Sequence, residues 1–444
     1  MNLYQSPYSR ARCLALWLVV AGCLAGRTEP FVPRDGQQVL ERLRNSAFDP
    51  AARELRELRA RLATNPQDLG LASQFAWKCL ERGRAEADPR YLGRAESALA
   101  PWWHSPRPPL EALVLRATLR QSQHDFTNAL ADLNLALDLA PGNAQAWLTR
   151  ATVLTVLGRY AEARRACIRL VGRAPELTAI TAAAGIGSLS GDAARSYELL
   201  RRTLAGHHSA SVPEKLWALT VLAETGARLG HVAEADTAFH QALGLGQRDA
   251  YLLGAYADFL LDQERANEVV ALLKDETRAD SLLLRLALAE SRLTPRPSGF
   301  TSHAATLRAR FEASHLRGDT VHQREEARFT LHLREQPAEA LRLAQANWQV
   351  QREPADARIL LETALAANEP AAADPVLEFL RRTKLEDVAL DPLVALLSQS
   401  PKAESPRAGR LPLRSPPPAE RAANPTWSTS PSPAAAELSE NVKP

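Results

Sequence analysis

The sequence lacks an excess of charge of either sign. Its 444 residues carry 54 Lys and Arg against 51 Asp and Glu, which leaves a formal net charge of +3. Proteins that bind nucleic acid usually carry a strong basic surplus that attracts the phosphate backbone, and so small a surplus in a chain of this length does not supply one. The composition therefore argues against a nucleic acid as partner.

The sequence also lacks the short motifs of common catalytic sites. It contains no HExxH zinc motif, no Walker A loop and no CxxC pair. The glycines of residues 185–191 are misspaced for a phosphate loop, and no strand pattern precedes them. We therefore expect a protein that is not an enzyme and uses no cofactor.

Histidines are few and scattered. Only His207 and His208 are adjacent, and no third ligand is obvious near them, so the pair is weak evidence for metal. His315 and His322 flank Gly318 and are expected to form a surface pair. We predict no metal site, and a metal-binding or enzymatic accessory protein is the least favoured alternative.

Cysteines number only four, and two of them lie in the amino-terminal segment, at Cys13 and Cys23. The other two, Cys79 and Cys167, fall on a first and a second helix of different repeats in the register given below. Their Cα atoms should then lie well beyond the ~7 Å limit for a disulfide. We expect both to be isolated core residues.

Long apolar runs are absent after residue 22. At the amino terminus Arg10 and Arg12 precede an apolar run over residues 13–22, and no acidic residue appears before Glu29. The run is about half the ~20 residues that span a bilayer as a helix. This pattern is typical of a signal peptide over residues 1–22.

The run ends in Val20-Ala21-Gly22-Cys23, which resembles the lipobox of bacterial lipoproteins. The resemblance implies that Cys23 is the lipid acceptor and becomes the new amino terminus. Leu24 is not acidic, which favours the outer membrane over retention at the inner one. Residues 23–34 would form a flexible tether. The alternative is an ordinary signal peptide cut after Ala25 or Gly26, with a periplasmic or secreted product.

Small residues, aromatics and prolines recur at a spacing of 34 residues between Leu110 and Pro175. Ala117 superimposes on Ala151, and Pro141 on Pro175. This period resembles the tetratricopeptide (TPR) repeat, whose units are antiparallel helix pairs. The resemblance implies an all-α, right-handed superhelical solenoid over residues 35–397, with its clearest repeats at 110–260.

The margins of the array are irregular. Residues 38–44 and 50–62 look like an atypical helical pair, and residues 294–298 predict a long loop. Residues 304–333 and 338–365 read as two more helix pairs, although the repeat phase between 276 and 340 stays open. Residues 375–382 and 387–397 predict capping helices. The proline-rich residues 398–444 predict a disordered tail.

The groove of TPR proteins is lined by defined positions of the first helices. Carried over position by position, these positions predict a set of partner-binding residues: Trp217, Glu224, Arg228, Tyr251, Asp258, Asp262, Trp348 and Arg352. Aromatic residues and arginine often anchor interfaces, which favours Trp217, Tyr251, Trp348 and Arg228. The alternative is that Trp217 and Tyr251 only pack between repeats. The abundance of arginine in general is taken as coding bias.

These features predict a non-enzymatic scaffold or adaptor, anchored to the bacterial envelope through lipid and facing the periplasm from the outer membrane. Its partner would be a protein or peptide of open identity, and its oligomeric state is open too. It resembles TPR lipoproteins that assist envelope assemblies. The alternative is a secreted or periplasmic spacer whose array holds its ends apart without a groove ligand.

Overall fold

A computed structural model describes residues 49–399 except residue 320. The expected signal peptide, Cys23, the tether, the helix at residues 38–44 and the tail beyond residue 399 lie outside the described residues. Within the described part every regular element is helical, so the prediction of an all-α array is confirmed. None of the helices in this part is both long and apolar enough to cross a membrane.

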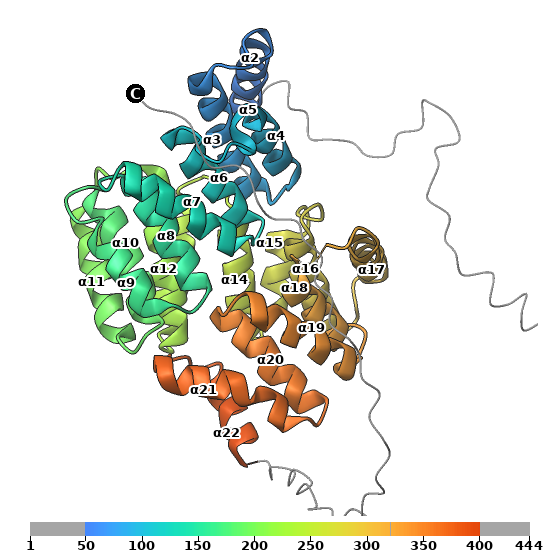
Figure 1. Cartoon of the computed structure of the whole chain (residues 1–444). Coiled ribbons are helices and arrows are strands. Elements are labelled where there is room, and N and C mark those ends of the chain that lie inside the picture. The colour runs from blue at the N-terminus through green and yellow to red at the C-terminus, as the bar shows by residue number, and fades with distance from the viewer. Residues whose placement is uncertain (1–48, 320, 400–444) are drawn as a thin grey trace, which may run out of the picture. The chain divides into compact units, whose positions relative to one another are not determined.

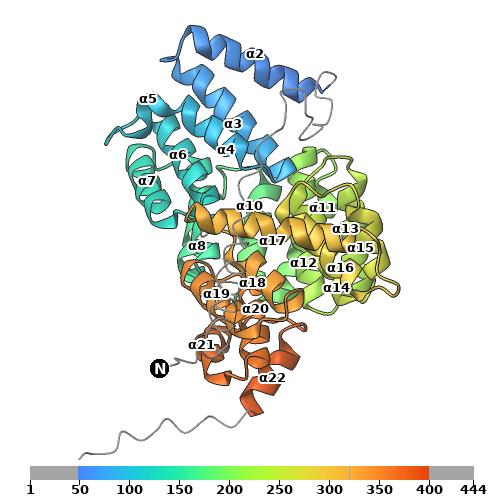
Figure 2. The same cartoon turned by 90° about the vertical axis from the view of Figure 1, so that its right-hand side faces the viewer.

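The helices follow one another with short connections (Figures 1 and 2). Their bounds are α2 Pro50–Thr64, α3 Leu69–Glu86, α4 Arg90–Ala98, α5 Ala100–Trp103, α6 Leu110–Ser122, α7 Phe126–Leu139, α8 Ala144–Val156, α9 Tyr160–Ile168, α10 Glu176–Ser188, α11 Ala193–Gly206, α12 Val212–Arg228, α13 Val232–Gly244, α14 Ala250–Asp262, α15 Ala266–Leu273, α16 Asp280–Arg292, α17 Phe300–Leu316, α18 Gln323–His332, α19 Pro337–Val350, α20 Pro354–Ala366, the 3₁₀ helix η2 Pro370–Ala373, α21 Asp374–Thr383 and α22 Asp391–Gln399.

The helices pack as antiparallel pairs, beginning with α3 and α4 and continuing through α6/α7, α8/α9, α10/α11, α12/α13 and α14/α15. The first helices of successive pairs also contact one another and form a continuous layer, here called the first-helix face. The small residues of the repeat lie where helices approach closely, and Ala117, Ala151 and Ala163 are buried. Residues 178–207, a degenerate stretch of the repeat, still form the regular pair α10/α11.

A left-handed residue makes the turn inside several pairs. Gly158, Gly191 and Gly230 have φ of 70°, 83° and 78°. His124 and Glu264 occupy the same place in their pairs, 34 residues before Gly158 and 34 after Gly230, with φ of 60° and 57°. Side chains with a Cβ are strained in this region, so the geometry of the turn is set by the packing of its two helices rather than by glycine.

The phase between α16 and α19 differs from the sequence expectation. Gly318 turns the chain between α17 and α18 as expected, but α17 packs on α16, and α18 packs on α19. The predicted long loop is only the short connection of residues 293–299. The helix pair expected over residues 304–333 is therefore wrong, because α17 and α18 belong to different pairs. The reason is that Leu307 and Phe311 of α17 share one core with the buried residues of α16, which the period alone does not specify.

The carboxy-terminal helices do more than cap the last pair. Phe379 of α21 packs edge-on against Tyr160 of α9, with ring centroids 5.9 Å apart. Two backbone hydrogen bonds join the same regions: the Arg352 N–H donates to the Val156 carbonyl at 2.8 Å, and Val388 N–H donates to the Arg228 carbonyl at 3.0 Å. Residues about two hundred positions apart thus share one core, in which α20, α21 and α22 pack with α8, α9 and α10.

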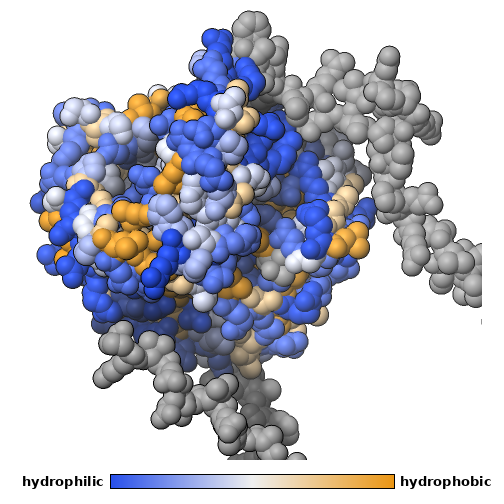
Figure 3. Space-filling model, turned by 45° about the horizontal axis from the view of Figure 1, so that its top comes forward, coloured by the Kyte–Doolittle hydropathy of each residue, from blue (hydrophilic) through white to orange (hydrophobic). Residues whose placement is uncertain are grey.

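Cys79 lies on α3 and Cys167 on α9, and both are buried free thiols, as expected. Burial raises the pKa of each thiol to about 11, so neither is poised to react. The surface seen in Figure 3 is mainly hydrophilic with separate hydrophobic patches. Most of the apolar side chains of the repeats are thus buried between helices.

Substituting Gly158 tests the packing of the carboxy-terminal helices on the middle pairs. A Cβ at Gly158 would lie 2.6 Å from the Phe379 Cε2 atom, whereas a Cβ at Gly172, with a nearly identical φ of 71°, meets no atom within 4 Å. Gly172→Ala should therefore cost only left-handed strain, about 1–2 kcal/mol. Gly158→Ala should cost a further ~1–3 kcal/mol of overpacking, measured as the free energy of unfolding in urea. Equal losses in the two variants would contradict the contact.

Candidate functional site

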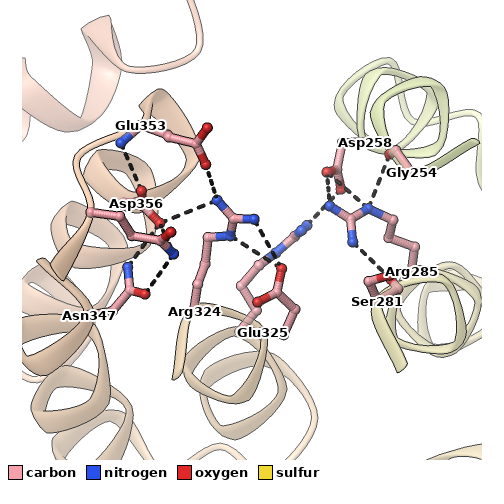
Figure 4. Close-up of polar contacts among 11 residues, drawn as sticks. Gly254, Asp258, Ser281, Arg285, Arg324, Glu325, Asn347, Glu353 and Asp356 are labelled. Atoms are coloured by element: carbon pink, nitrogen blue, oxygen red, sulfur yellow. Dashed lines mark hydrogen bonds and ion pairs between the residues drawn. The ribbon is translucent and has the colours of Figure 1, made fainter. Parts of the chain in front are cut away.

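A network of charged side chains joins the first-helix face to helices much later in the chain (Figure 4). Its first centre is Asp258 of α14. Arg285 of α16 donates to its carboxylate from Nε at 3.0 Å and from Nη2 at 2.5 Å. Arg328 of α18 donates to the other oxygen at 3.0 Å. Two arginines from different pairs therefore hold one carboxylate.

The second centre is Arg324 of α18. Its Nη1 lies 2.9 Å from the Glu353 carboxylate and 3.3 Å from Asp356, and its Nη2 lies 3.2 Å from Glu325. Asp356 is fully buried at the start of α20, where it also accepts from the Asn347 side chain at 2.8 Å and from the Glu353 N–H at 2.7 Å. Every group of this cluster thus has a partner of opposite charge or a hydrogen bond.

A third pairing reaches from α14 to α20. Arg358 donates to Asp262 at 2.8 Å and to Glu362 at 2.8 Å, and His332 lies 3.0 Å from Glu362. Asp262 and Arg358 are 96 residues apart in the sequence. The last helices are therefore held against α14 by ion pairs as well as by apolar packing.

The pKa values of the carboxyls differ with their surroundings. Burial opposes the ionisation of Asp258, but Arg285 and Arg328 together outweigh it and lower the pKa of that carboxyl. Burial is likewise outweighed at Glu325, where Arg324 is the main opposing charge and the pKa falls to about 2. At Asp356 burial prevails over the Arg324 charge and raises the pKa to about 6. Of the three carboxyls Asp258, Glu325 and Asp356, Asp356 therefore titrates nearest neutral pH.

Four of the predicted partner-binding residues are bonded to other side chains of the chain itself. Asp258 and Asp262 are bound to the chain's own arginines, as described above. Tyr251 is 63% exposed and donates to Glu224 at 2.8 Å. The Glu224 charge raises the pKa of Tyr251. Burial raises the pKa of Glu224 against the opposing charge of Arg228.

The other four predicted residues pack against neighbouring helices to different degrees. Trp217 of α12 is half-buried against the core of α8–α10. Arg228 donates to the Ser188 hydroxyl at 2.7 Å. Trp348 is 3% exposed and meets Phe379 edge-on, with ring centroids 5.2 Å apart. The expectation that Trp348 and Arg352 belong to a first helix is corrected, because α19, which carries Trp348, packs as the second helix with α18, and Arg352 lies in the connection after α19.

The residues that sequence reasoning missed are the arginines Arg285, Arg324, Arg328 and Arg358. Their residue type does not mark them in the sequence, because arginine is abundant throughout the chain. A usable signal exists, since Asp258 and Asp262 lie one helical turn apart on an apolar helix, and Arg324 and Arg328 have the same spacing. Two matching pairs of opposite charge point to an ion-pair interface between helices.

An open hollow of about 390 Å³ lies elsewhere on the first-helix face, over α3, α6 and α8. Its lining comprises Gly70, Ser73, Gln74, Trp77, Glu111, Val114, Asn143 and Gln145. Gln74, Glu111 and Gln145 are exposed, whereas Val114 is buried and Trp77 half-buried. The Ser73 hydroxyl is buried without a hydrogen-bond partner. The hollow thus offers an apolar floor and polar groups at its rim.

Among the described residues 49–399, no three His, Cys, Asp or Glu side chains are grouped so that they could hold a metal ion. The His207 ring contacts the Thr203 carbonyl at 2.7 Å and lies 3.3 Å from Glu176. His315 does not pair with His322 but lies 2.6 Å from Glu326. The predicted surface pair across Gly318 is therefore wrong, because the His315 ring contacts Glu326 of α18 instead.

The titration of Asp356 predicts how stability changes with pH. Because its pKa rises from 3.8 to about 6 on folding, the folded chain retains a proton that the unfolded chain releases. This stabilisation is complete below the unfolded pKa and is lost as the pH rises through the folded pKa. Between about pH 5 and pH 7.5 the free energy of unfolding should fall by ~1 kcal/mol on this account.

Urea unfolding at the two pH values measures this change. Asp356→Asn, which cannot titrate, should flatten the dependence even if it lowers stability at both pH values. The matched exposed variant Asp138→Asn should keep the wild-type slope. A wild-type slope in Asp356→Asn would show that another group titrates.

One protein-family model matches part of the repeat region. Residues 121–184 match the family model described as the tetratricopeptide repeat. A comparison with curated proteins finds no significant match. Among solved structures, the chain is similar to the APC/C hetero-tetramer Cut9–Hcn1, at 14% identity and a TM-score of 0.41, over 79% of this chain and 59% of that one.

Two further solved structures are similar over most of their length. Human IFIT1 with m7Gppp-AAAA gives 13% identity and a TM-score of 0.40, over 79% of this chain and 86% of that one. A tetratricopeptide repeat protein from Parabacteroides merdae gives 15% identity and a TM-score of 0.29, over 73% and 99%. The matched segment covers α7 to α9 and most of α10, within the regular series of helix pairs, so this part of the chain is similar to the tetratricopeptide repeat.

Proposed function

We propose that this chain is a non-enzymatic scaffold that binds a protein or peptide on its first-helix face, at the hollow over α3, α6 and α8. The observation that carries the proposal is the hollow itself. It is open at a place where three successive first helices present their side chains, whereas Asp258 and Asp262 further along are engaged by the chain's own arginines.

The lining of the hollow suits an extended peptide. Trp77 and Val114 offer apolar surface for one side chain, and the exposed Glu111 carboxylate can pair with a basic one. The unpartnered Ser73 hydroxyl can bond to the peptide backbone, which would remove the cost of leaving it buried and unsatisfied. The hollow also includes Glu111, Val114 and Gln145, which occupy the second or fifth position of their first helices.

Trp217, Glu224 and Tyr251 form a second candidate surface for the same function. The exposed ring of Tyr251 and its bond to Glu224 supply an aromatic group held in a fixed position. If this surface binds the partner, Tyr251→Ala should weaken binding more than changes at the hollow do.

We further propose that the chain is a lipoprotein of the bacterial envelope, acylated at Cys23 and facing the periplasm from the outer membrane. The support is the amino-terminal sequence, in which a basic start and a short apolar run end in Val20-Ala21-Gly22-Cys23. Two or three acyl chains would hold the protein at the membrane, since each buried methylene contributes about 0.8 kcal/mol. The remaining candidate, a spacer without a groove ligand, predicts no peptide binding.

Selection from a random-peptide display library on the full chain, followed by fluorescence anisotropy, tests the hollow. Glu111→Lys and Gln145→Trp should each weaken a selected peptide at least about tenfold, because they remove the rim charge or fill the space. Glu312→Lys, on the exposed side of α17, is the matched control and should bind like the wild type. A library that yields no binder would favour the spacer.

Metabolic labelling with a palmitate analogue tests the anchor. The wild-type chain, expressed in a bacterial host with its amino terminus intact, should be labelled and sediment with membranes. Cys23→Ser should carry no label and appear in the soluble fraction, because serine cannot form the thioether. Label that persists in Cys23→Ser would refute the lipid acceptor assigned here.

A further inference from the structure

The outer surface carries an apolar turn surrounded by arginines at the end of α9. By the 34-residue period α9 corresponds to α7, which continues to Leu139, but α9 ends at Ile168. Residues 169–173 instead form a turn with Gly172 at φ 71°. Shortening the helix by these residues changes which side chains face the solvent.

One residue of the turn is anchored in the core, whereas its neighbours expose apolar side chains to solvent. Leu170 is fully buried in the core, and its carbonyl accepts from the N–H groups of Arg173 and Ala174 at 2.9 Å each. Ile168 and Val171 are instead 67% and 70% exposed, and Leu139 at the end of α7 is 66% exposed. Single exposed aliphatic side chains are ordinary, but Ile168 and Val171 lie three residues apart and together form an exposed apolar tip at the end of α9.

Arginines flank this tip. Arg165, Arg169 and Arg173 are all exposed, and no carboxylate of the described residues lies within 4 Å of their guanidinium nitrogens. Arg169 lies over the Trp147 ring of α8, 5.8 Å from its centroid. The Trp147 Nε1–H in turn donates to the Pro141 carbonyl at 2.8 Å, in the connection that follows Leu139. The Glu162 carboxylate, on the same helix, interacts with the Arg165 charge and offsets part of the positive charge of the three arginines.

We propose that this surface, defined by Ile168, Val171, Arg165, Arg169 and Arg173 and called the α9 tip, docks on an anionic phospholipid membrane. Aliphatic tips between arginines fit the boundary between headgroups and acyl chains, where the apolar groups insert and the guanidinium groups remain at the phosphates. The surplus of positive charge selects anionic lipid over zwitterionic lipid. The proposal does not depend on the peptide hollow or on acylation at Cys23.

Vesicle sedimentation of the full chain bearing Cys23→Ser, prepared without acyl groups, tests the proposal. The chain should bind vesicles of equimolar phosphatidylcholine and phosphatidylglycerol, bind pure phosphatidylcholine far less, and lose binding as salt is added. Replacing Arg165, Arg169 and Arg173 together by Glu should lower the partition coefficient about 100-fold or more. Ile168→Ser with Val171→Ser should lower it about tenfold.

Matched controls lie on other helices of the same chain. Leu316→Ser removes an aliphatic side chain that is 90% exposed, and Arg308→Glu with Arg381→Glu reverses two exposed charges. These variants should bind within about twofold of the parent chain, apart from the general effect of net charge. Circular dichroism confirms that each variant is folded.

The proposal is overturned if anionic and neutral vesicles are bound alike, if no vesicle is bound, or if the controls lose as much binding as the α9-tip variants. It is also overturned if the Ile168→Ser and Val171→Ser pair abolishes self-association in the absence of vesicles, which would make the α9 tip an interface between copies of the chain. Binding of a selected peptide at the hollow would be unchanged in either case, so the two proposals fail separately.

Discussion

The contact of α21 with the α8–α9 turn is the constraint on which the rest of the structure depends. Phe379 fits against Gly158 only because that residue has no Cβ, and Gly158 is also the left-handed residue in the turn between α8 and α9. One residue therefore serves both the repeat and the long-range contact. The backbone bond from Arg352 to Val156 lies beside it and fixes the register between the two regions.

The ion pairs complement this apolar contact, and they are costly to form. A buried carboxylate or guanidinium loses its hydration, which only well-placed partners can offset. Asp258 meets this condition with two arginines from different helices, and Arg324 meets it with three carboxylates. Such groups contribute specificity more than stability, because any other alignment of α14, α18 and α20 would leave a charge without its partner.

Sequence reasoning succeeded where interactions are local. The buried small residues Ala117 and Ala151 and the breaks between helix pairs at Pro141 and Pro175 follow from the 34-residue period, because each acts within one helix pair or between adjacent ones. The left-handed conformations of His124 and Glu264 escaped notice because their residue types do not mark such turns. The pairing of α16 with α17 was missed because the period there is too weak to assign helices to pairs.

The candidate sites were harder to predict for a different reason. Asp258 and Asp262 were selected from repeat positions, but whether such positions are open depends on side chains 70 and 96 residues away. The hollow over α3, α6 and α8 was not singled out, because α3 matches the repeat poorly. Position within a repeat thus indicates which way a side chain points, and the distant parts of the chain decide whether solvent reaches it.

The docking of α21 also bears on the order in which the protein folds. Because a chain emerges from the ribosome amino terminus first, α8 and α9 are complete long before Phe379 is made, and the surface of Tyr160 and Gly158 stays uncovered in the interval. The helix pairs can form early from local contacts, whereas this closure joins segments about two hundred residues apart and must come late. Until then the nascent array carries an apolar surface on which a chaperone, or a second nascent copy, could bind.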